Sequence, residues 1–289
     1  MVADEINRVK NNFGNSSIFG GSYGWASAGR FHHAQSQLHR FLNCIGGYTR
    51  SKFTYSFAAA EAMIPHILGS YRAYLDTCTS WDLIKKDTKL FVCFGGVPIK
   101  NSQICQGGTG NHYQRESLID AGNNGIEFVN ISPLKSDLID EVKGEWLAAR
   151  PNTDTALMLG IAHTLHVEGL SNKNFLENYT EGFDIFLSYL LGTDDGVEKN
   201  AEWAANICDI PAIQIKDLAR RMVSNRTMIS VSWSLTRQDH GEQPFWMAIM
   251  LASMIGQIGL PGGGFGFGYS ATNHIGGKFK ILPGAAFPQ

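Results

Sequence analysis

Short, nearly continuous apolar runs alternate along this chain with longer segments whose apolar residues recur every three to four positions. The runs at 89–94, 125–131 and 227–232 predict strands buried on both faces, and a shorter strand is predicted at 17–19. Helices are predicted at 4–13, 29–44, 58–69, 155–166, 174–179, 183–191, 201–207, 211–223 and 245–258. The glycine-rich segment 262–277 is expected to be loop. Strands separated by helices indicate an α/β fold, with Rossmann-like three-layer sandwiches around mostly parallel sheets.

The residues that follow the predicted strands are the first candidates for a site, because ligands bind at the carboxyl ends of parallel strands. These stretches are 20–25, 95–101, 131–133 and 233–237, and they are rich in Gly, Ser, Asn, Trp, Lys and Arg. Arg and Lys bind phosphates, Gly-rich turns let backbone N–H groups approach them, and Trp offers a face for stacking. The set suits a large, phosphate-bearing ligand with flat rings.

Composition narrows the function classes. With 289 residues, 44% of them hydrophobic, the chain can form one large or two ordinary domains. A net charge of −2 gives no general attraction to nucleic acid or to an anionic membrane. The longest apolar run, 245–255, is too short to span a bilayer, and residues 2–13 are too charged for the apolar centre of a signal peptide. Five cysteines without a C-x-x-C pair argue against a zinc site, an iron–sulfur cluster or a disulfide framework.

Three short motifs leave alternatives open. Residues 20–24 match G-x-S-x-G, so Ser22 is a formal candidate for a hydrolase nucleophile, although no acid and histidine follow in an obvious arrangement. Gly266, Gly268 and Ala271 match a dinucleotide fingerprint, but they follow a glycine run instead of a predicted strand. The pairs 32–33 and 163/166 supply histidines without a third metal ligand, and surface or core histidines are the better interpretation.

A resemblance decides more than these motifs do. The turn Tyr23-Gly24-Trp25 with Ser27 is followed by Gly46-Gly47-Tyr48 and by Tyr55-Ser56 before a helix. Further matching segments occur in order at 79–81, 98–101, 152–165, 201–204, 225–228, 233–237, 241–243 and 251–266. Together they resemble the dimethyl sulfoxide reductase family of molybdopterin oxidoreductases, in its branch of trimethylamine N-oxide, dimethyl sulfoxide and biotin sulfoxide reductases.

The resemblance implies a molybdenum atom held by two molybdopterin guanine dinucleotides, with Ser56 as the protein ligand. Taken without the resemblance, Ser56 would instead suit the N-cap of the following helix. The resemblance further implies that Trp25 and Tyr23 donate hydrogen bonds to the oxygen transferred from an N-oxide or S-oxide. The cofactor contacts implied in this way are Trp25, Ala26, Ser27, Lys100, Asn101, Ile131, Ser132, Asn152, Thr153, Asp154, Trp233, Ser234 and Arg237.

Ser132 is a departure from the resemblance. It stands before Pro133, where the family usually has an Asp whose carboxylate accepts hydrogen bonds from a ribose. Ser132 could contact the ribose only without charge. Asn101 likewise stands where Thr is common, and residues 106–115 are unlike the usual versions.

The resemblance also implies an organisation and partners. Catalytic chains of the family are far longer, so we expect this chain to be a fragment covering domains II and III of the family fold. Residues 1–70 would begin the molybdenum-site domain, 71–232 would form an inserted guanine-dinucleotide domain, and 233–289 would return to the first domain with a Gly-rich loop. The expected partners are a small N-oxide or S-oxide, an electron donor such as a c-type cytochrome, and the remainder of the catalytic chain. The compartment stays open: periplasmic by resemblance, or cytoplasmic for the biotin sulfoxide type. A non-catalytic cofactor-binding module is the alternative for the chain alone.

Overall fold

The computed structural model describes residues 1–22, 24–27, 32–105 and 110–277. The chain folds into two compact units. The first contains Met1–Thr54 and the described part of Ile104–Asn111, and the second contains Tyr55–Gln103 and the described part of His112–Lys278. The sequence-based domain bounds, 1–70, 71–232 and 233–289, follow a different division and stay a prediction.

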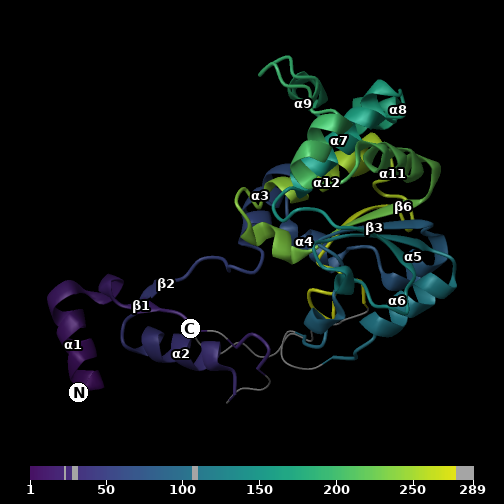
Figure 1. Cartoon of the computed structure of the whole chain (residues 1–289). Coiled ribbons are helices and arrows are strands. Elements are labelled where there is room, and N and C mark those ends of the chain that lie inside the picture. The colour runs from purple at the N-terminus through teal and green to yellow at the C-terminus, as the bar shows by residue number, and fades with distance from the viewer. Residues whose placement is uncertain (23, 28–31, 106–109, 278–289) are drawn as a thin grey trace. The chain divides into compact units, whose positions relative to one another are not determined.

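A five-stranded parallel sheet forms the centre of the second unit (Figure 1). Its strands are β3 (Leu90–Phe94), β4 (Glu127–Ile131), β5 (Gly144–Leu147), β6 (Thr227–Val231) and β7 (Gly264–Phe267). They lie in the order β5-β4-β3-β6-β7. The chain therefore runs outward from β3 in one direction, then crosses back and runs outward from β6 in the other. The boundary between β3 and β6 is a topological switch point, the place where such sheets bind ligands.

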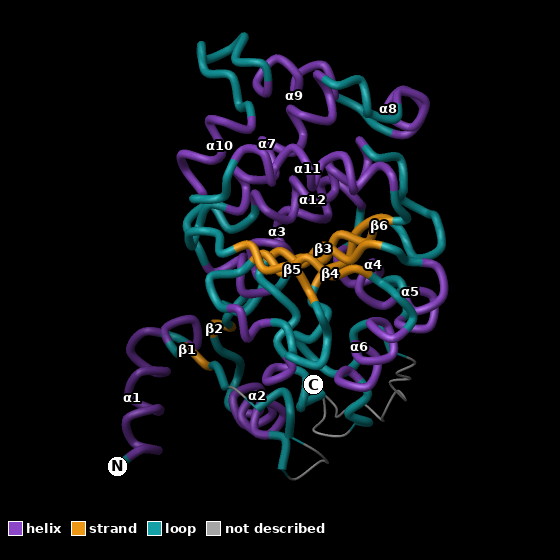
Figure 2. Tube along the Cα trace, turned by 45° about the vertical axis from the view of Figure 1, so that its right-hand side comes forward, coloured by secondary structure: helices purple, strands orange, loops and turns teal. Residues whose placement is uncertain are grey.

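Helices cover both faces of this sheet, as Figure 2 shows. One face packs against α3 (Ala58–Leu68), α7 (Asp154–Val167), α11 (Ala212–Ser224) and α12 (Gln243–Met254), with α10 (Ala201–Cys208) packed on α7. The other face packs against α5 (Trp81–Asp87) and α6 (Gln114–Asn123). Shorter helices are α4 (Tyr71–Asp76), α8 (Lys173–Tyr179) and α9 (Phe183–Leu190).

Strand β3 shows why its sequence is almost wholly apolar. Val92 and Phe94 belong to the core beneath α7 and α12, whereas Phe91 and Cys93 belong to the core beneath α5 and α6. Successive side chains of a strand point to opposite faces, so a strand covered on both sides needs apolar residues at every position. The predicted α/β class with a parallel, doubly covered sheet is confirmed.

Several local predictions need correction. Residues 264–267 were expected to be loop but form β7, because Phe265 and Phe267 alternate into the core while Gly266 leaves room for the Tyr269 ring. A Cβ at Gly266 would lie 2.2 Å from Cε2 of Tyr269. The strand expected at 17–19 is instead a 3-10 turn, Asn15–Ser17, followed by β1 (Phe19–Gly20). Strand β5 and helices α4, α5 and α6 were not predicted.

The first unit is small and buries little apolar surface. It contains α1 (Val2–Phe13), β1, α2 (Ala34–Cys44) and β2 (Thr49–Arg50), and β1 pairs with β2 in parallel. Gly20 is required in β1, since a Cβ there would lie 2.2 Å from Cδ1 of the buried Leu42. The residues 29–31 of the predicted helix 29–44 lie outside the described residues, and α2 begins at Ala34.

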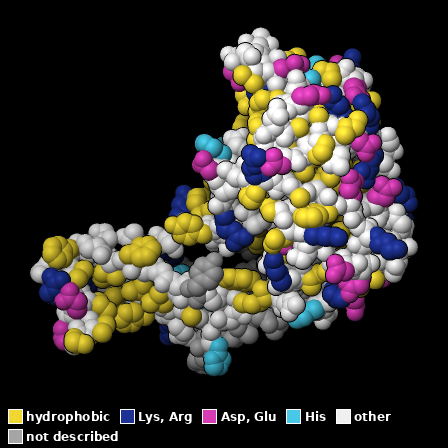
Figure 3. Space-filling view, viewed as in Figure 1, with side chains coloured by type: hydrophobic (Ala, Val, Ile, Leu, Met, Phe, Trp, Pro, Cys, Tyr) yellow, Lys and Arg dark blue, Asp and Glu magenta, His cyan; other side chains and the backbone are white. Residues whose placement is uncertain are grey.

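The distribution of charge on the surface does not indicate a further class of partner. Acidic and basic side chains are interspersed over the face of the second unit seen in Figure 3. Within the described residues, no helix is both long enough and apolar enough to cross a bilayer.

Candidate functional site

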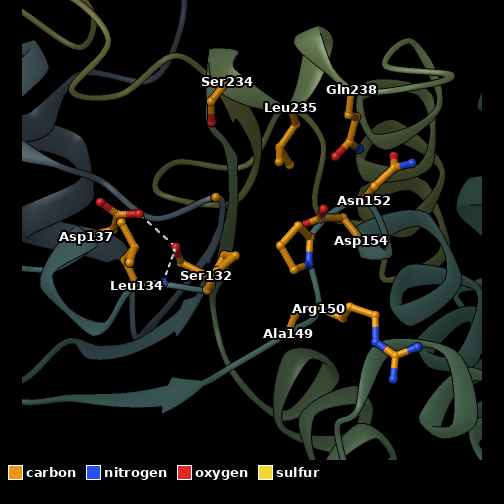
Figure 4. A pocket seen from close by; sticks show the side chains of 13 residues that line it. Ser132, Leu134, Asp137, Ala149, Arg150, Asn152, Asp154, Ser234, Leu235 and Gln238 are labelled. Atoms are coloured by element: carbon orange, nitrogen blue, oxygen red, sulfur yellow. Dashed lines mark hydrogen bonds between the residues drawn. The ribbon is translucent and has the colours of Figure 1, made fainter.

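A hollow of about 280 Å³ opens at the carboxyl ends of the strands in the second unit. Its walls come from the turns that follow β3, β4, β5 and β6. The lining residues are Gly95, Ser132, Pro133, Leu134, Asp137, Ala149, Arg150, Pro151, Asn152, Asp154, Ser234, Leu235 and Gln238. Four residues predicted from the sequence therefore come together here: Ser132, Asn152, Asp154 and Ser234 (Figure 4).

One side of the hollow follows β4. Ser132 donates its hydroxyl to Oδ2 of Asp137 at 2.7 Å, and its Oγ accepts the backbone N–H of Leu134 at 3.2 Å. Its backbone carbonyl accepts the indole N–H of Trp146 at 2.8 Å. Ile131, the last residue of β4, is fully buried and contributes its carbonyl to the backbone N–H of Gly95 at 2.8 Å. This side is thus a fixed polar wall and not a loose loop.

The opposite side is the beginning of α7, where Asn152, Asp154 and Gln238 lie together in Figure 4. Asn152 has a φ of 64°, a left-handed conformation that Asn adopts more readily than most residues. Thr153 is the N-cap residue of α7 and donates its hydroxyl to the carbonyl of Arg150 at 2.6 Å. Arg150 in turn forms two hydrogen bonds with Asp209, at 2.7 and 3.0 Å.

Asp154 is a buried acid in this wall, with 6% of its surface exposed. Burial raises its pKa to about 6, while hydrogen bonds from its own backbone N–H and from Gln238 act in the opposite direction. The carboxylate is therefore ionised at neutral pH, in a position where water does not solvate it well. A ligand that donates hydrogen bonds would compensate the lost hydration.

The turn after β6 connects this hollow to Ser56. The 3-10 helix Trp233–Arg237 supplies Ser234 and Leu235 to the lining, and Thr236 in the same turn donates its hydroxyl to the backbone carbonyl of Ser56 at 3.1 Å. Trp233 packs on Phe57, with ring centroids 4.1 Å apart. Phe57, not Ser56, is the N-cap residue of α3 and makes no side-chain cap hydrogen bond. The N-cap alternative for Ser56 is therefore wrong.

The other predicted contacts lie outside the lining. Lys100 is exposed and reaches Oδ1 of Asp137 at 3.2 Å, so it contacts the hollow through that carboxylate. Asn101 is exposed in the 3-10 turn Ile99–Asn101, and Arg237 is exposed at the end of the turn after β6.

The turn that contains Trp25, predicted from the resemblance to lie beside the transferred oxygen, belongs to the first unit. Ser27 donates its backbone N–H to the carbonyl of Gly24 at 2.9 Å, which closes a turn with Trp25 and Ala26 at its corners. Gly24 has a φ of 128°, which favours glycine. Tyr23 lies outside the described residues.

Sequence reasoning missed Asp137, Gln238 and Thr236. Asp137 enters the hollow only because the 3-10 turn Lys135–Asp137 folds back after β4, and no strand-end pattern indicates that. Thr236 lies inside the stretch 233–237 that follows a predicted strand, and Gln238 is the next residue, so a search of every side chain in that stretch extended by one residue would have found both.

The G-x-S-x-G motif and the dinucleotide fingerprint do not lie in the local structures that their functions require. Strand β1 ends at Gly20 and helix α2 begins at Ala34, so Ser22 does not sit on a tight strand-to-helix elbow. Gly266 lies inside β7, and turns follow it where a dinucleotide fingerprint needs a helix.

One histidine of each predicted pair has a structural partner. His33 caps α2 by accepting the backbone N–H of Ser36, and His163 pairs with Glu198 at 2.7 Å. Among the described residues, no group of three or more His, Cys, Asp or Glu side chains is arranged to hold a metal ion. The five cysteines all belong to the described residues, and none of them forms a disulfide.

Comparisons with known proteins agree with this architecture. The profile of the molybdopterin oxidoreductase family matches residues 1–287. The chain is 45% identical to a biotin sulfoxide reductase of Cereibacter sphaeroides, over 100% of this chain and 39% of the relative. It is 45% identical to a dimethyl sulfoxide/trimethylamine N-oxide reductase of the same organism, over 94% of this chain and 33% of the relative. It is 42% identical to a trimethylamine-N-oxide reductase of Haemophilus influenzae, over 94% of this chain and 33% of the relative.

The chain therefore spans between about a third and two-fifths of the length of these relatives. Among solved structures, acetylene hydratase from Pelobacter acetylenicus has the same fold, with a TM-score of 0.57 and 19% identity. That likeness covers 89% of this chain and 32% of the hydratase.

Proposed function

The chain belongs to the molybdopterin oxidoreductase family, and on that premise we propose that it is the part of an N-oxide or S-oxide reductase that supplies the serine ligand of molybdenum and binds a guanine dinucleotide arm of the cofactor. The family uses molybdenum with molybdopterin. The bis(guanine dinucleotide) form and the roles of individual residues belong to the proposal. The relatives named above, reductases of biotin sulfoxide, dimethyl sulfoxide and trimethylamine N-oxide, support this class of substrate.

The observation that carries the proposal is the hollow at the switch point between β3 and β6, whose turn after β6 also contacts Ser56. A dinucleotide needs a crevice at this place, with groups for a base, a ribose and phosphates. The hollow offers polar walls from Ser132 and Asp137 on one side and from Asn152 and Asp154 on the other. The residues present therefore fit a nucleotide in kind and position.

Asp154 suits the guanine base. Guanine presents two adjacent N–H donors on one edge, and a carboxylate accepts both with its two oxygens. Burial makes the carboxylate costly without such a partner, since its pKa is raised to about 6. A base that donates hydrogen bonds to Asp154 would be favoured over adenine, which presents an acceptor at the corresponding edge. Ser234, Trp233, Arg237, Lys100 and Asn101 are the proposed contacts to the remainder of the cofactor.

Ser56 is the proposed protein ligand. An alkoxide oxygen is a hard donor and suits a high-valent metal. A ligand must also be held in place, and the Thr236 hydroxyl contacts the backbone carbonyl of Ser56 at 3.1 Å. When bound, the molybdenum group supplies two-electron oxygen-atom transfer.

Trp25 and Tyr23 are the proposed donors to the transferred oxygen. Both carry a polar hydrogen at the end of a rigid ring, so each can stabilise negative charge without a large loss of side-chain entropy. The turn closed between Gly24 and Ser27 holds the backbone of Trp25. A small N-oxide or S-oxide is the proposed substrate, and an electron donor such as a c-type cytochrome is the proposed partner.

The function is tested in a chimera in which this chain replaces the matching segment of the Cereibacter sphaeroides biotin sulfoxide reductase. The purified chimera is analysed for molybdenum and for guanine nucleotide released by acid hydrolysis. It is then assayed with trimethylamine N-oxide, dimethyl sulfoxide and biotin sulfoxide against a reduced viologen dye. We expect bound molybdenum, released guanine nucleotide and turnover of at least one substrate. A folded chimera that contains neither metal nor guanine nucleotide would contradict the proposal.

A further inference from the structure

Asp137 is a carboxylate in the wall of the hollow that neither motif nor resemblance indicated. Its side chain is 13% exposed and lines the hollow beside Ser132 (Figure 4). Oδ2 accepts the Ser132 hydroxyl at 2.7 Å, and Oδ1 lies 3.2 Å from Nζ of Lys100. Both oxygens are therefore oriented by named partners.

The local backbone holds Asp137 at the strand ends. After β4 the 3-10 turn Lys135–Asp137 folds back, and the carbonyl of Asp137 accepts the backbone N–H of Val97 at 2.8 Å. Gly96 makes this approach possible: it has a φ of 70°, and a Cβ there would lie 2.5 Å from Cβ of Asp137. Two segments that follow neighbouring strands, β3 and β4, thus fix one carboxylate.

Ser132 cannot by itself replace the carboxylate expected at its position. Its one hydroxyl proton is donated to Asp137, and its oxygen already accepts the N–H of Leu134. An ionised carboxyl has about four acceptor positions, and Ser132 and Lys100 occupy two of those on Asp137. The remaining positions can accept two further hydrogen bonds from a ligand in the hollow.

We propose that Asp137 binds the ribose of the guanine nucleotide, with its carboxylate accepting hydrogen bonds from the ribose hydroxyls and Ser132 positioning it. The inference rests on the proposed function of the hollow and adds a binding residue to it. The acceptor for the ribose is thereby displaced five residues along the chain, from the strand-end position of Ser132 to the turn that follows. The two side chains together supply the charge and the position that one Asp would supply after β4.

The simpler interpretation of Asp137 is an ordinary ion pair with Lys100. The Lys100 side chain is 64% exposed, so this pair contributes little to stability. An ion pair would make no distinction between a ribose and a ribose without hydroxyls. The two interpretations therefore differ in a measurable way.

The experiment uses the 289-residue chain with GDP and 2′,3′-dideoxy-GDP, titrated by isothermal calorimetry. We expect the unmodified chain to bind GDP about tenfold more tightly than the dideoxy analogue, as hydrogen bonds to a charged group suggest. Asp137→Asn should weaken GDP binding by about the same factor and leave binding of the analogue unchanged. Asp140→Asn is the matched control, because Asp140 is an exposed carboxyl outside the lining, and it should behave as the unmodified chain.

The outcomes separate the two proposals. Failure of the unmodified chain to bind GDP would overturn the nucleotide assignment of the hollow, and the role of Asp137 with it. Binding of GDP in which Asp137→Asn keeps the full preference over the dideoxy analogue would overturn the role of Asp137 alone. If circular dichroism shows that Asp137→Asn does not fold, Ser132→Ala replaces it. That variant should then lower the preference for GDP, and an unchanged preference would overturn the inference.

Discussion

The hydroxyl of Thr236 donates a hydrogen bond to the backbone carbonyl of Ser56, across 180 residues of sequence and 3.1 Å of space. The single proton of this hydroxyl is shared with the carbonyl of Trp233, which accepts it at 2.9 Å. One buried side chain thus connects the start of α3 to the turn after β6. This contact joins the proposed metal ligand to the lining of the hollow within the second unit. It links the two halves of the proposed site.

Replacing Thr236 with Val tests that link. The change keeps the shape and removes the hydroxyl, and we expect the free energy of unfolding to fall by about 1–2 kcal/mol. In the chimera it should also lower turnover by about tenfold, because the Ser56 turn loses its support. Thr88→Val is the control. The buried Thr88 hydroxyl donates a hydrogen bond to the Gly262 carbonyl at 2.6 Å, and neither residue belongs to the turn after β6. A similar loss of turnover in both variants would show that Thr236 acts only through stability.

Asp154 should make stability depend on pH. Its pKa is raised from 3.8 to about 6 by burial, so its contribution is most favourable below pH 4 and is lost as the pH rises through 6. Asp154→Asn removes that loss. Relative to the unmodified chain, the variant should gain about 2.4 kcal/mol of unfolding free energy between pH 4 and pH 7.5. Urea titrations at the two pH values measure the difference in unfolding free energy between variant and unmodified chain, with Asp140→Asn as the exposed control. The same difference at both pH values would contradict the burial argument.

The same Asp154 variant connects stability to binding. If the buried carboxylate serves to bind a ligand, the more stable Asn variant should bind GDP less tightly. Binding sites often retain residues that lower stability because function needs them. Unchanged GDP affinity in a folded Asp154→Asn chain would remove Asp154 from the base contact.

Gly268 should be intolerant of a side chain. It has a φ of 82°, and a Cβ there would lie 2.1 Å from Nε1 of Trp233. Gly268→Ala should therefore lower the free energy of unfolding by about 3 kcal/mol, from backbone strain together with the clash. Gly169→Ala is the matched control: its φ is 67°, and a Cβ meets nothing within 4 Å. It should cost only about 1 kcal/mol. Equal losses in a thermal or urea unfolding series would mean that the Trp233 contact is not tight.

Much of the fold could be predicted because buried parallel strands require unbroken apolar runs, as in β3, β4 and β6. Strand β5 escaped prediction because its residues Gly144–Trp146 are exposed and resemble a loop. Strand β7 escaped because glycine usually indicates a turn, whereas here it makes room for Tyr269. In both cases the deciding contacts come from residues distant in sequence.

Some residues of the candidate site could likewise be predicted from the sequence, and others could not. Ser132, Asn152, Asp154 and Ser234 follow strands or begin a helix, so their positions could be predicted from local pattern and resemblance. Asp137 depends on a turn of three residues, and the contact of Ser56 with Thr236 depends on how α3 packs beside the turn after β6. Neither can be read from spacing along the chain.

The most direct test of the account is the activity of Ser56→Ala in the chimera, beside Ser51→Ala as a matched serine at an exposed position. Reduction of trimethylamine N-oxide and dimethyl sulfoxide by a reduced viologen dye is measured for both, together with folding by circular dichroism and molybdenum content. We expect that Ser56→Ala folds but loses turnover, while Ser51→Ala keeps it. Undiminished turnover in Ser56→Ala would contradict the assignment of Ser56 as the metal ligand.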